Sequence, residues 1–295
     1  MNKTYPTFDI CNLISNKLSN DVFNADRFEG YLLNNPPIAN IHKHSFYHLV
    51  YFTSGTGNHT IDFTNYRIKE GCIYFMSPGQ VHNWEFETDV SGFVVNFSDI
   101  FFNQLSLSSC ILDQFTFFDV FSSIQMLEIK TAQRTKIIEI FENILQELAN
   151  ITQFTPLMIA SKMIQLFILV SRELPEERLG AIRNNHNYIV LKQFLDLIED
   201  NFKDLRLPRD YAPLLYITSN HLNFLCKEQF NMPAGEIIRK RILLEAKRLL
   251  INYELSIANI AMELNFFDTS YFIKFFKKYT NLTPEAFRRQ FYGNA

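Results

Sequence analysis

The stretch from residue 257 to residue 284 restricts the fold of this chain more than any other, because apolar residues recur with helical period on both sides of a turn. Four of them, at positions i, i+3, i+4 and i+7, mark the buried face of a first helix: Ile257, Ile260, Ala261 and Leu264. Asn265 follows, where a helix commonly ends on a residue with positive φ, a conformation that Asn tolerates. The spacing therefore predicts a helix that stops sharply at Asn265.

A second helix is predicted directly after this turn. Asp268 or Thr269 is placed to cap its N-terminus, and Phe272, Phe276 and Tyr279 repeat at i, i+4 and i+7 as its inner face. Its outer face is polar and basic, with Ser270, Tyr271, Lys274, Lys277 and Lys278. A short helix that supports a second helix with such an outer face is typical of a DNA-reading helix-turn-helix.

The segments IANIAMELNF and DTSYFIKFFKKYTNLTPEAFRR resemble the second helix-turn-helix of the AraC family of bacterial transcription regulators. The matching positions are many, ordered and correctly spaced, which favours this interpretation over a helical hairpin with a solvated basic face. Asn265 stands where the family usually carries Gly, so the turn is expected to hold some strain. The resemblance implies that bases are read by Thr269, Ser270, Tyr271 and Lys274, with Lys277 and Lys278 near phosphate.

A first helix-turn-helix of the family is matched upstream by LRLPRDYAPLLYITSNHLNFLCKEQFNMPAGEIIRKR, after a helix expected over Tyr188–Phe202. Thr218 or Ser219 is expected to cap its recognition helix. Three residues are expected to face inward: Leu222, Leu225 and Cys226. The positions that read bases in family members hold Asn220, Asn223 and Phe224 here, and Lys227 is placed to reach phosphate.

Two residues of this first motif depart from the family pattern. Phe224 stands where many relatives have Arg, which removes a bidentate contact to guanine and leaves an apolar contact with a thymine methyl. Pro213 falls inside the supporting helix unless that helix begins as late as Asp210, and an interior Pro costs about 3 kcal/mol. We therefore expect a short or kinked supporting helix, followed by a long helix over Glu236–Leu250 that joins the two motifs.

The charge of the chain is unevenly divided. The 295 residues are 47% hydrophobic and 20% charged, as in an ordinary globular protein long enough for two domains. Residues 183–295 carry 16 Lys and Arg against 12 Asp and Glu, whereas residues 1–182 carry 12 against 19. A basic C-terminal part beside an acidic N-terminal part is consistent with phosphate contact at one end only.

The cysteines, the N-terminus and the longest apolar run all favour a cytoplasmic protein. Cys11, Cys72, Cys110 and Cys226 form no CxxC pair and no zinc-ligand spacing, so reduced thiols are expected. The N-terminal MNKTYPTFDICN has no apolar core of a signal peptide. The run Met163–Val170 is too short to span a bilayer, and no membrane partner is expected.

The N-terminal part changes to short strands. HLVYF, HTIDF, GCIYFM and GFVVNF are β-branched and aromatic runs separated by turns such as SGTGN and SPGQ, which predicts a sandwich or a small barrel. The stretch IHKHSFYHLVYFTSGTG…GCIYFMSPGQVHNWEF resembles the cupin barrel that AraC-type regulators often carry as an effector-binding domain. This resemblance implies a small-molecule effector inside the barrel.

The histidines of this part are the candidate effector site. His42, His44 and His48 share strand parity and His82 follows the SPGQ turn, so all four are expected to point into the barrel. Metal-binding cupins resemble His-x-His, then Glu, then a later His, and His48 stands near the Glu position. Four imidazoles suit a transition metal, but regulators of this architecture often keep these histidines while binding an organic effector. We expect a metal-free pocket, with Trp84 either stacking on the ligand or filling the core.

Two amphipathic helices are predicted between the barrel and the DNA-binding part, over Ala132–Asn150 and Pro156–Leu174. Their spacing predicts these inward residues: Ile137, Ile140, Phe141, Ile144 and Leu148 in the first helix, and Ile159, Met163, Leu166, Phe167 and Val170 in the second. Their broad apolar faces resemble the dimerisation helices of the family, and they could equally pack back on the barrel. The polar segment PEERLGAIRNNHN, residues 175–187, is the predicted boundary.

Together these patterns predict an α+β protein with a cupin-like β-barrel over residues 1–130, a helical dimerisation element and linker over 131–182, and an all-α domain with two helix-turn-helix motifs over 183–295. The expected partners are double-stranded DNA, a small-molecule effector, a second copy of the chain and RNA polymerase, with no cofactor. No GxSxG, HExxH, P-loop or GxGxxG motif supports an enzyme. Two alternatives stay open: a metal-dependent cupin enzyme with a helical appendage, and a regulator whose barrel serves only dimerisation.

Overall fold

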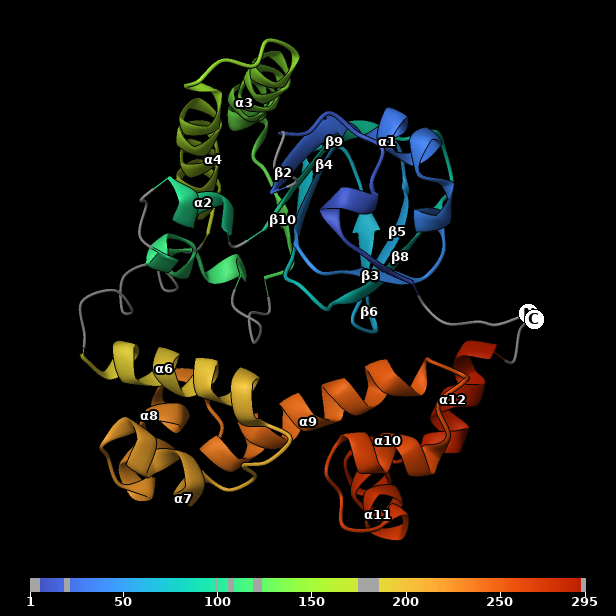
Figure 1. Ribbon diagram of the computed structural model, residues 1–295, viewed down its shortest axis with the longest axis vertical. Helices are drawn as coiled ribbons and strands as arrows, with labels where there is room; N and C mark the ends of the chain where they lie inside the picture. Colours follow the sequence, from blue (N-terminus) through green and yellow to red (C-terminus); the bar gives the residue numbers. More distant parts are fainter. Residues whose placement is uncertain are drawn as a thin grey trace. The chain divides into compact units, whose positions relative to one another are not determined.

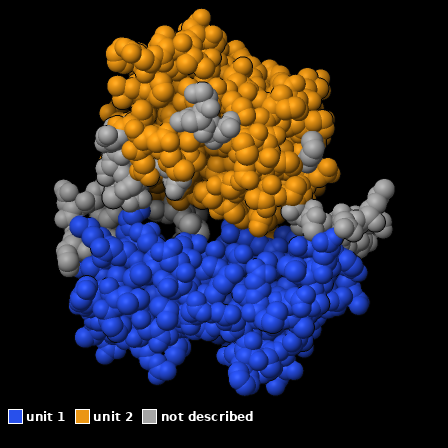
Figure 2. Space-filling view, viewed as in Figure 1, with its two compact units in different colours: residues 1–5, 180–295 blue, residues 6–179 orange. Residues whose placement is uncertain are grey.

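The computed structural model describes residues 6–18, 22–98, 100–105, 109–118, 124–174 and 186–292. It divides into two compact units, which we call the N-terminal unit (within residues 6–179) and the C-terminal unit (within residues 180–295) (Figures 1 and 2). The predicted boundary segment 175–187 falls almost entirely outside the described residues. No helix in the described part of the chain has the length and apolar character needed to cross a membrane.

The strands of the N-terminal unit form two five-stranded sheets. The first has the order β1 (Thr7–Phe8), β3 (His42–His44), β8 (Val81–Phe86), β5 (Gly57–Ile61) and β6 (Thr64–Ile68). The second has the order β10 (Met126–Glu128), β7 (Cys72–Met76), β4 (Tyr47–Ser54), β9 (Ser91–Phe97) and β2 (Phe23–Arg27). Among the described strands no ladder joins the two sheets, so the predicted barrel is not closed and the unit is a two-sheet sandwich.

The central strand β4 separates two cores, because successive side chains of a strand point to opposite faces. Val50 and Phe52 face one core, which includes Trp84 and the short helix α1 (Phe28–Asn34). Leu49 and Tyr51 face the other core, on the opposite side of the same sheet. Smaller helical turns complete this unit: Ile10–Asn12, Pro36–Ala39, α2 (Ile100–Gln104), Ser109–Gln114 and Thr116–Phe118.

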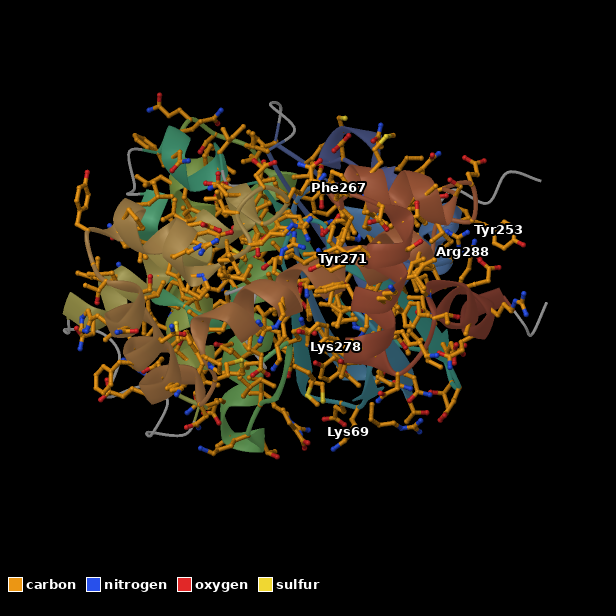
Figure 3. The ribbon with its side chains drawn as sticks, turned by 90° about the horizontal axis from the view of Figure 1, so that it is seen from below. Lys69, Tyr253, Phe267, Tyr271, Lys278 and Arg288 are labelled. Atoms are coloured by element: carbon orange, nitrogen blue, oxygen red, sulfur yellow. The ribbon has the colours of Figure 1, made fainter. Side chains whose placement is uncertain are left out.

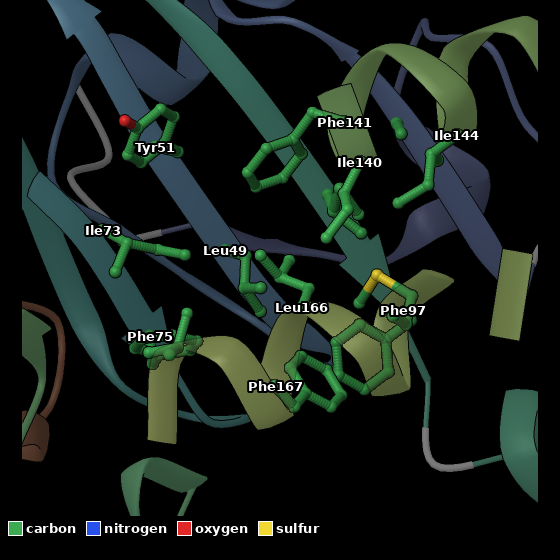
Figure 4. Close-up of a cluster of buried hydrophobic side chains, with 14 of the residues drawn as sticks. Leu49, Tyr51, Ile73, Phe75, Phe97, Ile140, Phe141, Ile144, Leu166 and Phe167 are labelled. Carbon is green, nitrogen blue, oxygen red and sulfur yellow. The ribbon is translucent and has the colours of Figure 1, made fainter. Parts of the chain in front are cut away.

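Two long helices, α3 (Thr131–Ala149) and α4 (Thr155–Ser171), cover the outer face of the second sheet (Figures 1 and 4). Every predicted inward residue is buried: Ile137, Ile140, Phe141, Ile144, Leu148, Ile159, Met163, Leu166, Phe167 and Val170. Phe141 stacks on Tyr51 and on Phe93, with ring centroids 5.7 and 5.0 Å apart. The sequence left open whether these apolar faces bind a second chain or pack on the strands, and in the structure they pack on the sheet.

The C-terminal unit is all helical. Its helices are α6 (His186–Asn201), α7 (Pro208–Tyr211), α8 (Ser219–Phe230), α9 (Ala234–Leu250), α10 (Ile257–Glu263), α11 (Thr269–Thr280) and α12 (Pro284–Tyr292). The prediction of a short supporting helix is confirmed, since α7 has four residues and continues as a 3-10 turn that contains Pro213, Ala212–Leu215. The predicted joining helix is confirmed as α9.

Two buried arginines hold α9, one from its middle and one at its C-terminal end. Arg241 Nε lies 2.8 Å from the carboxylate of Glu199 on α6, and its Nη1 lies 2.9 Å from Glu245. Arg288 on α12 donates to the carbonyl oxygens of Leu250 and Leu255, at 3.0 and 2.6 Å. Because removing one partner of such a buried pair is strongly destabilising, these contacts tie α9 firmly to its neighbours.

Candidate functional site

The second predicted helix-turn-helix is formed by α10 and α11. The Asp268 carboxylate accepts a hydrogen bond from Tyr271 N at 2.7 Å, so Asp268 is the N-cap. Phe272 and Phe276 are fully buried, as predicted. Tyr279 was predicted as part of this inner stripe, and that is wrong, since its side chain is 42% exposed.

Phe275, which was not predicted to face inward, packs between Phe266 and Tyr279. Its ring lies 5.2 Å from that of Phe266 and 5.1 Å from that of Tyr279. The inner face of α11 thus includes Phe275 and Phe276. Tyr279 lies at the edge of this face, and the guanidinium of Arg239 lies 5.5 Å from the centre of its ring.

The turn between α10 and α11 adopts the predicted backbone conformation. Asn265 has φ of 51°, and its amide donates to Asp204 at 2.6 Å. Arg206 donates to the carbonyl oxygen of Leu264, and its guanidinium lies 4.2 Å above the Phe266 ring. These contacts hold a non-glycine residue in the left-handed region, which normally costs energy.

The outer face of α11 is exposed in the described part of the C-terminal unit. Five predicted DNA-contacting residues are exposed there: Ser270, Tyr271, Lys274, Lys277 and Lys278. Thr269 is half-buried at the first turn. Phe267, which the sequence reasoning missed, is 99% exposed just before the helix, and Figure 3 shows it with Tyr271 and Lys278 along this motif. The sequence did contain a signal for Phe267, because a large apolar residue stands there between the last inward residue, Leu264, and the cap, Asp268.

The first motif has fewer free polar groups. Thr218 caps α8, with its hydroxyl accepting from His221 N at 3.1 Å, and the predicted inward residues Leu222, Leu225 and Cys226 are buried. Asn220, Phe224 and Lys227 are exposed on its outer face. The Phe224 ring lies parallel to that of His221, at 6.3 Å and 13°.

Asn223 differs from the other predicted readers of α8, because its amide is used inside the unit. The Asn223 Nδ2 donates to the carbonyl oxygen of Ser219 at 3.0 Å. Its Oδ1 accepts from Ala234 N at 3.1 Å, at the first residue of α9. The N-cap residue of α9 is Pro233, which offers no side-chain cap. Asn223 therefore caps the joining helix.

The N-terminal unit gathers the predicted histidines between its two sheets. His42, His44, His48 and His82 are at most 3% exposed, and they come from β3, β4 and β8. The register pairs His42 with His82 across β3 and β8, and His48 with Asn96 across β4 and β9. A fifth histidine, His59 on β5, is fully buried in the same cluster. It was missed, although the alternation along Gly57–Ile61 would place it on the inner face.

The imidazoles contact one another directly. His44 Nε2 lies 3.0 Å from His42 Nε2 and 2.9 Å from His82 Nε2. His82 Nδ1 lies 3.0 Å from His59 Nε2. His48 Nδ1 contacts the amide oxygen of Asn96, and the amide nitrogen of Asn96 donates to Asn24 Oδ1. We call His42, His44, His48, His59 and His82 the histidine cluster.

Burial keeps the histidine cluster neutral. Desolvation lowers the pKa of His42 to about 4 and the pKa of His48 to about 3. It lowers the pKa of His44, His59 and His82 well below the ordinary value, and the neighbouring imidazoles add to this. Neutral imidazole is the form that binds metal ions and hydrogen-bonds to polar ligands.

Several polar atoms of this site have no hydrogen-bond partner among the described residues: His44 Nδ1, His48 Nε2, His59 Nδ1 and Trp84 Nε1. Trp84 is 5% exposed, and its ring lies 4.8 Å from that of His82. Each buried polar group left unpaired costs about 1–3 kcal/mol. A polar group placed among these atoms would remove that cost.

Both units match known protein families. A family model described as an AraC-like ligand binding domain matches residues 38–167, and one described as a helix-turn-helix domain matches residues 211–290. The HTH-type transcriptional activator AarP of Providencia stuartii is 30% identical over 34% of this chain and 73% of its own length.

Two further proteins are similar. The regulatory protein PocR of Salmonella typhimurium is 32% identical over 36% of this chain and 35% of its own length. Indeed, this chain spans about a third of the length of the first curated relatives that it matches. The structure of ToxT from Vibrio cholerae with bound unsaturated fatty acid is 14% identical over 92% of this chain and 97% of that chain, at a TM-score of 0.45.

Proposed function

Since the chain belongs to the AraC family of transcription regulators, we propose that it binds specific DNA sites through α8 and α11 and responds to a small molecule bound in its N-terminal unit. The observation that carries the DNA-binding part is the pair of capped helices with exposed outer faces, polar and basic on α11 and mixed on α8. The family is one of transcription regulators, so the alternative of a metal-dependent cupin enzyme is not supported.

The two recognition helices are proposed to contribute unequally. On α11 the proposed base-reading residues are Thr269, Ser270, Tyr271 and Lys274, with Lys277 and Lys278 at phosphate. On α8 the exposed candidates are Asn220 and Phe224, with Lys227 at phosphate, because Asn223 is engaged in capping α9. Two such helices on one joining helix would enter successive major grooves, about 34 Å apart. Most hydrogen-bonded discrimination would then fall in the half-site read by α11.

The effector is proposed to bind at the histidine cluster and Trp84. Convergent polar groups inside an apolar unit are typical of a ligand site. Strand β4 offers a route for the signal, since His48 lies on its inner face while Leu49 and Tyr51 on its outer face pack against α3 and α4. An effector would shift the population of arrangements only through unequal affinity for them.

A homodimer is proposed to form through the outer face of α4. The inner face is used by the sheet, but large apolar side chains remain exposed on or beside this helix: Phe154, Leu157, Met158 and Ile168. Sedimentation of the full chain tests this, with Leu157→Glu expected to produce monomers and Asn150→Asp as a charged control off this face. A wild-type chain that is monomeric at micromolar concentration would remove the claim. RNA polymerase is the partner through which the bound dimer would alter transcription.

The deciding experiment for the function is sequencing of genomic fragments that the full chain pulls down. Enriched fragments should share one motif with two half-sites a helical turn apart, and Lys274→Ala should reduce the enrichment. Fragments without a common motif would refute sequence-specific binding. For the effector, a ligand that binds only the folded state raises the melting temperature. If sugars, aromatic acids and amines all leave it unchanged, the dimerisation-only alternative gains.

A further inference from the structure

We propose that the N-terminal unit binds one divalent transition-metal ion between His42, His44 and His82, with the three Nε2 atoms as its ligands. This site lies within the proposed effector site and deepens that proposal. It differs from the metal-free pocket expected from the sequence. Metal binding itself is independent of DNA binding and is measured without DNA.

The geometry of the three nitrogens supports a metal centre. Potential ligand atoms of these three histidines all lie within 4.8 Å of one another. His44 Nε2 is 3.0 Å from His42 Nε2 and 2.9 Å from His82 Nε2. A tetrahedral ion bound at about 2.0–2.1 Å from each nitrogen separates its ligands by about 3.3–3.4 Å. Both separations from His44 are a few tenths of an ångström short of this spacing, so His42 and His82 would move outward from His44 to admit the ion, and the third separation, within 4.8 Å, would settle at the same value.

The protons of the cluster point to the same conclusion. His42 Nδ1 lies 2.7 Å from the carbonyl oxygen of Asn40, which can only accept, so neutral His42 presents a lone pair at Nε2. When His82 donates from Nδ1 to His59, its Nε2 is also a lone pair. A proton on His44 Nε2 would then face two acceptors, His42 Nε2 and His82 Nε2, and can serve only one of them well. A cation in place of that proton engages all three lone pairs at once.

The outer nitrogens of two ligands are already oriented as metal ligands require. Metal-binding histidines almost always donate their other ring N–H to an oxygen or a similar acceptor, which fixes the ring and its tautomer. His42 does so through the carbonyl oxygen of Asn40, and His82 does so in the tautomer in which its Nδ1 donates to His59 Nε2.

The fourth coordination position would be open. No Asp or Glu joins the three histidines in the described metal-ligating group, so the centre keeps the charge of the ion. Beside it, Trp84 Nε1 is an unpartnered donor and His48 Nε2 an unpartnered acceptor. Water, or an effector with a hydroxyl or carboxylate oxygen, would fit this position. Imidazole ligation suits Zn²⁺, Ni²⁺, Cu²⁺ and Fe²⁺, with Co²⁺ as a spectroscopic probe.

Trp84 provides a direct reporter, because it is the only Trp of the chain and its ring lies 4.8 Å from that of His82. Titrating the full-length chain with Co²⁺ should quench Trp84 fluorescence with saturation at one ion per chain. Zn²⁺ should then compete Co²⁺ away and restore the emission. Elemental analysis of protein purified without chelator gives the stoichiometry independently.

Substitutions test which histidines bind the ion. His82→Gln and His44→Gln should weaken Co²⁺ binding more than about 100-fold, whereas His59→Gln, which removes only the partner of His82 Nδ1, should weaken it about 10–100-fold. His221→Gln is the matched control, since His221 is exposed on α8 and should leave Co²⁺ affinity unchanged. Circular dichroism checks that each variant is folded, and the wild-type titration needs no variant.

Wild-type protein that neither contains metal nor shows saturable Trp84 quenching at micromolar Co²⁺ would overturn the inference. So would quenching that His221→Gln abolishes and His82→Gln leaves intact. Operator binding by the metal-free protein separates the two proposals. If DNA is bound and no metal is, the metal centre is refuted and the regulator remains. If metal is bound and no specific DNA is, the regulator fails and the metal centre remains.

Discussion

Asn220 and Asn223 form a matched pair that tests the assignment of roles on α8. Both occupy positions where family members read bases, and they lie three residues apart on one helix. The Asn220 side chain is exposed and makes no hydrogen bond within the described chain. Asn223 donates to Ser219 and accepts from the first N–H of α9. We expect Asn223→Ala to change stability and Asn220→Ala to change DNA reading.

The expected magnitudes follow from these contacts. Losing a helix cap costs about 1 kcal/mol, within a range of about 0.5–2, and an internal hydrogen bond contributes about 1 kcal/mol. Asn223→Ala should therefore destabilise the C-terminal unit by about 1–2 kcal/mol, which lowers the melting temperature by about 4–8 °C per kcal/mol. Asn220→Ala should stay within about 0.5 kcal/mol in stability and cost about 1–3 kcal/mol at one base pair.

The assay pairs thermal unfolding, followed by far-UV circular dichroism, with binding titrations against singly mutated operators. Asn223→Asp tests capping separately, because Asp keeps the acceptor for Ala234 N and adds a favourable negative charge at a helix N-terminus. It should restore most of the stability lost in Asn223→Ala. If Asn223→Ala leaves the melting temperature unchanged and relaxes preference at one base pair, Asn223 reads DNA and our reasoning is wrong.

Four further substitutions test the remaining roles. Lys274→Ala should cost about 1–3 kcal/mol at one base pair if Lys274 reads a guanine edge, while Phe224→Ala should lose only the smaller energy of a thymine-methyl contact. Lys278→Ala should weaken all sequences alike and lower the salt slope by about 1 in binding titrations. Phe141→Ala should destabilise the N-terminal unit by about 3–5 kcal/mol in denaturant titrations followed by Trp84 fluorescence.

Each of these has a result that counts against it. Greater loss of base preference in Phe224→Ala than in Lys274→Ala would make α8 the dominant reader. A sequence-selective effect of Lys278→Ala would place Lys278 at a base edge. A loss below about 1 kcal/mol in Phe141→Ala would mean that α3 does not rest on the sheet through this ring.

The helical elements were predictable because helix periodicity is local information. The predicted inward residues of α3 and α4 are buried, and the caps of α8 and α11, Thr218 and Asp268, are each one of the two candidates that the sequence offered. What the spacing could not specify is the surface that covers an apolar face. A second copy of the chain and the sheet formed by β4 and β9 would select the same pattern, and only the folded chain distinguishes them.

The individual roles on a recognition helix were less predictable. Three residues along an α-helix correspond to a rotation of about 300°, so Asn220 and Asn223 differ by about 60° in direction. That difference is enough to leave one amide in solvent and bring the other to the first N–H of α9. The partner of Asn223 lies on the next helix, and the sequence of α8 alone contains nothing that identifies it.

The histidine cluster shows the same limit for strands. Strand alternation correctly placed His42, His44 and His48 on inner faces, and His82, noted for its place after the SPGQ turn, is buried with them. The distances between their nitrogens depend on the register of β3 with β8, and several other strands intervene between these two in the sequence. Whether three imidazoles form a hydrogen-bonded core or a metal centre depends on a few tenths of an ångström and on the outer partner of each ring. The carbonyl oxygen of Asn40 leaves the Nε2 of His42 as a lone pair, and a donation from His82 Nδ1 to His59 would do the same for His82. These partners lie outside the motif and are the reason why we propose a metal centre where the sequence predicted a metal-free pocket.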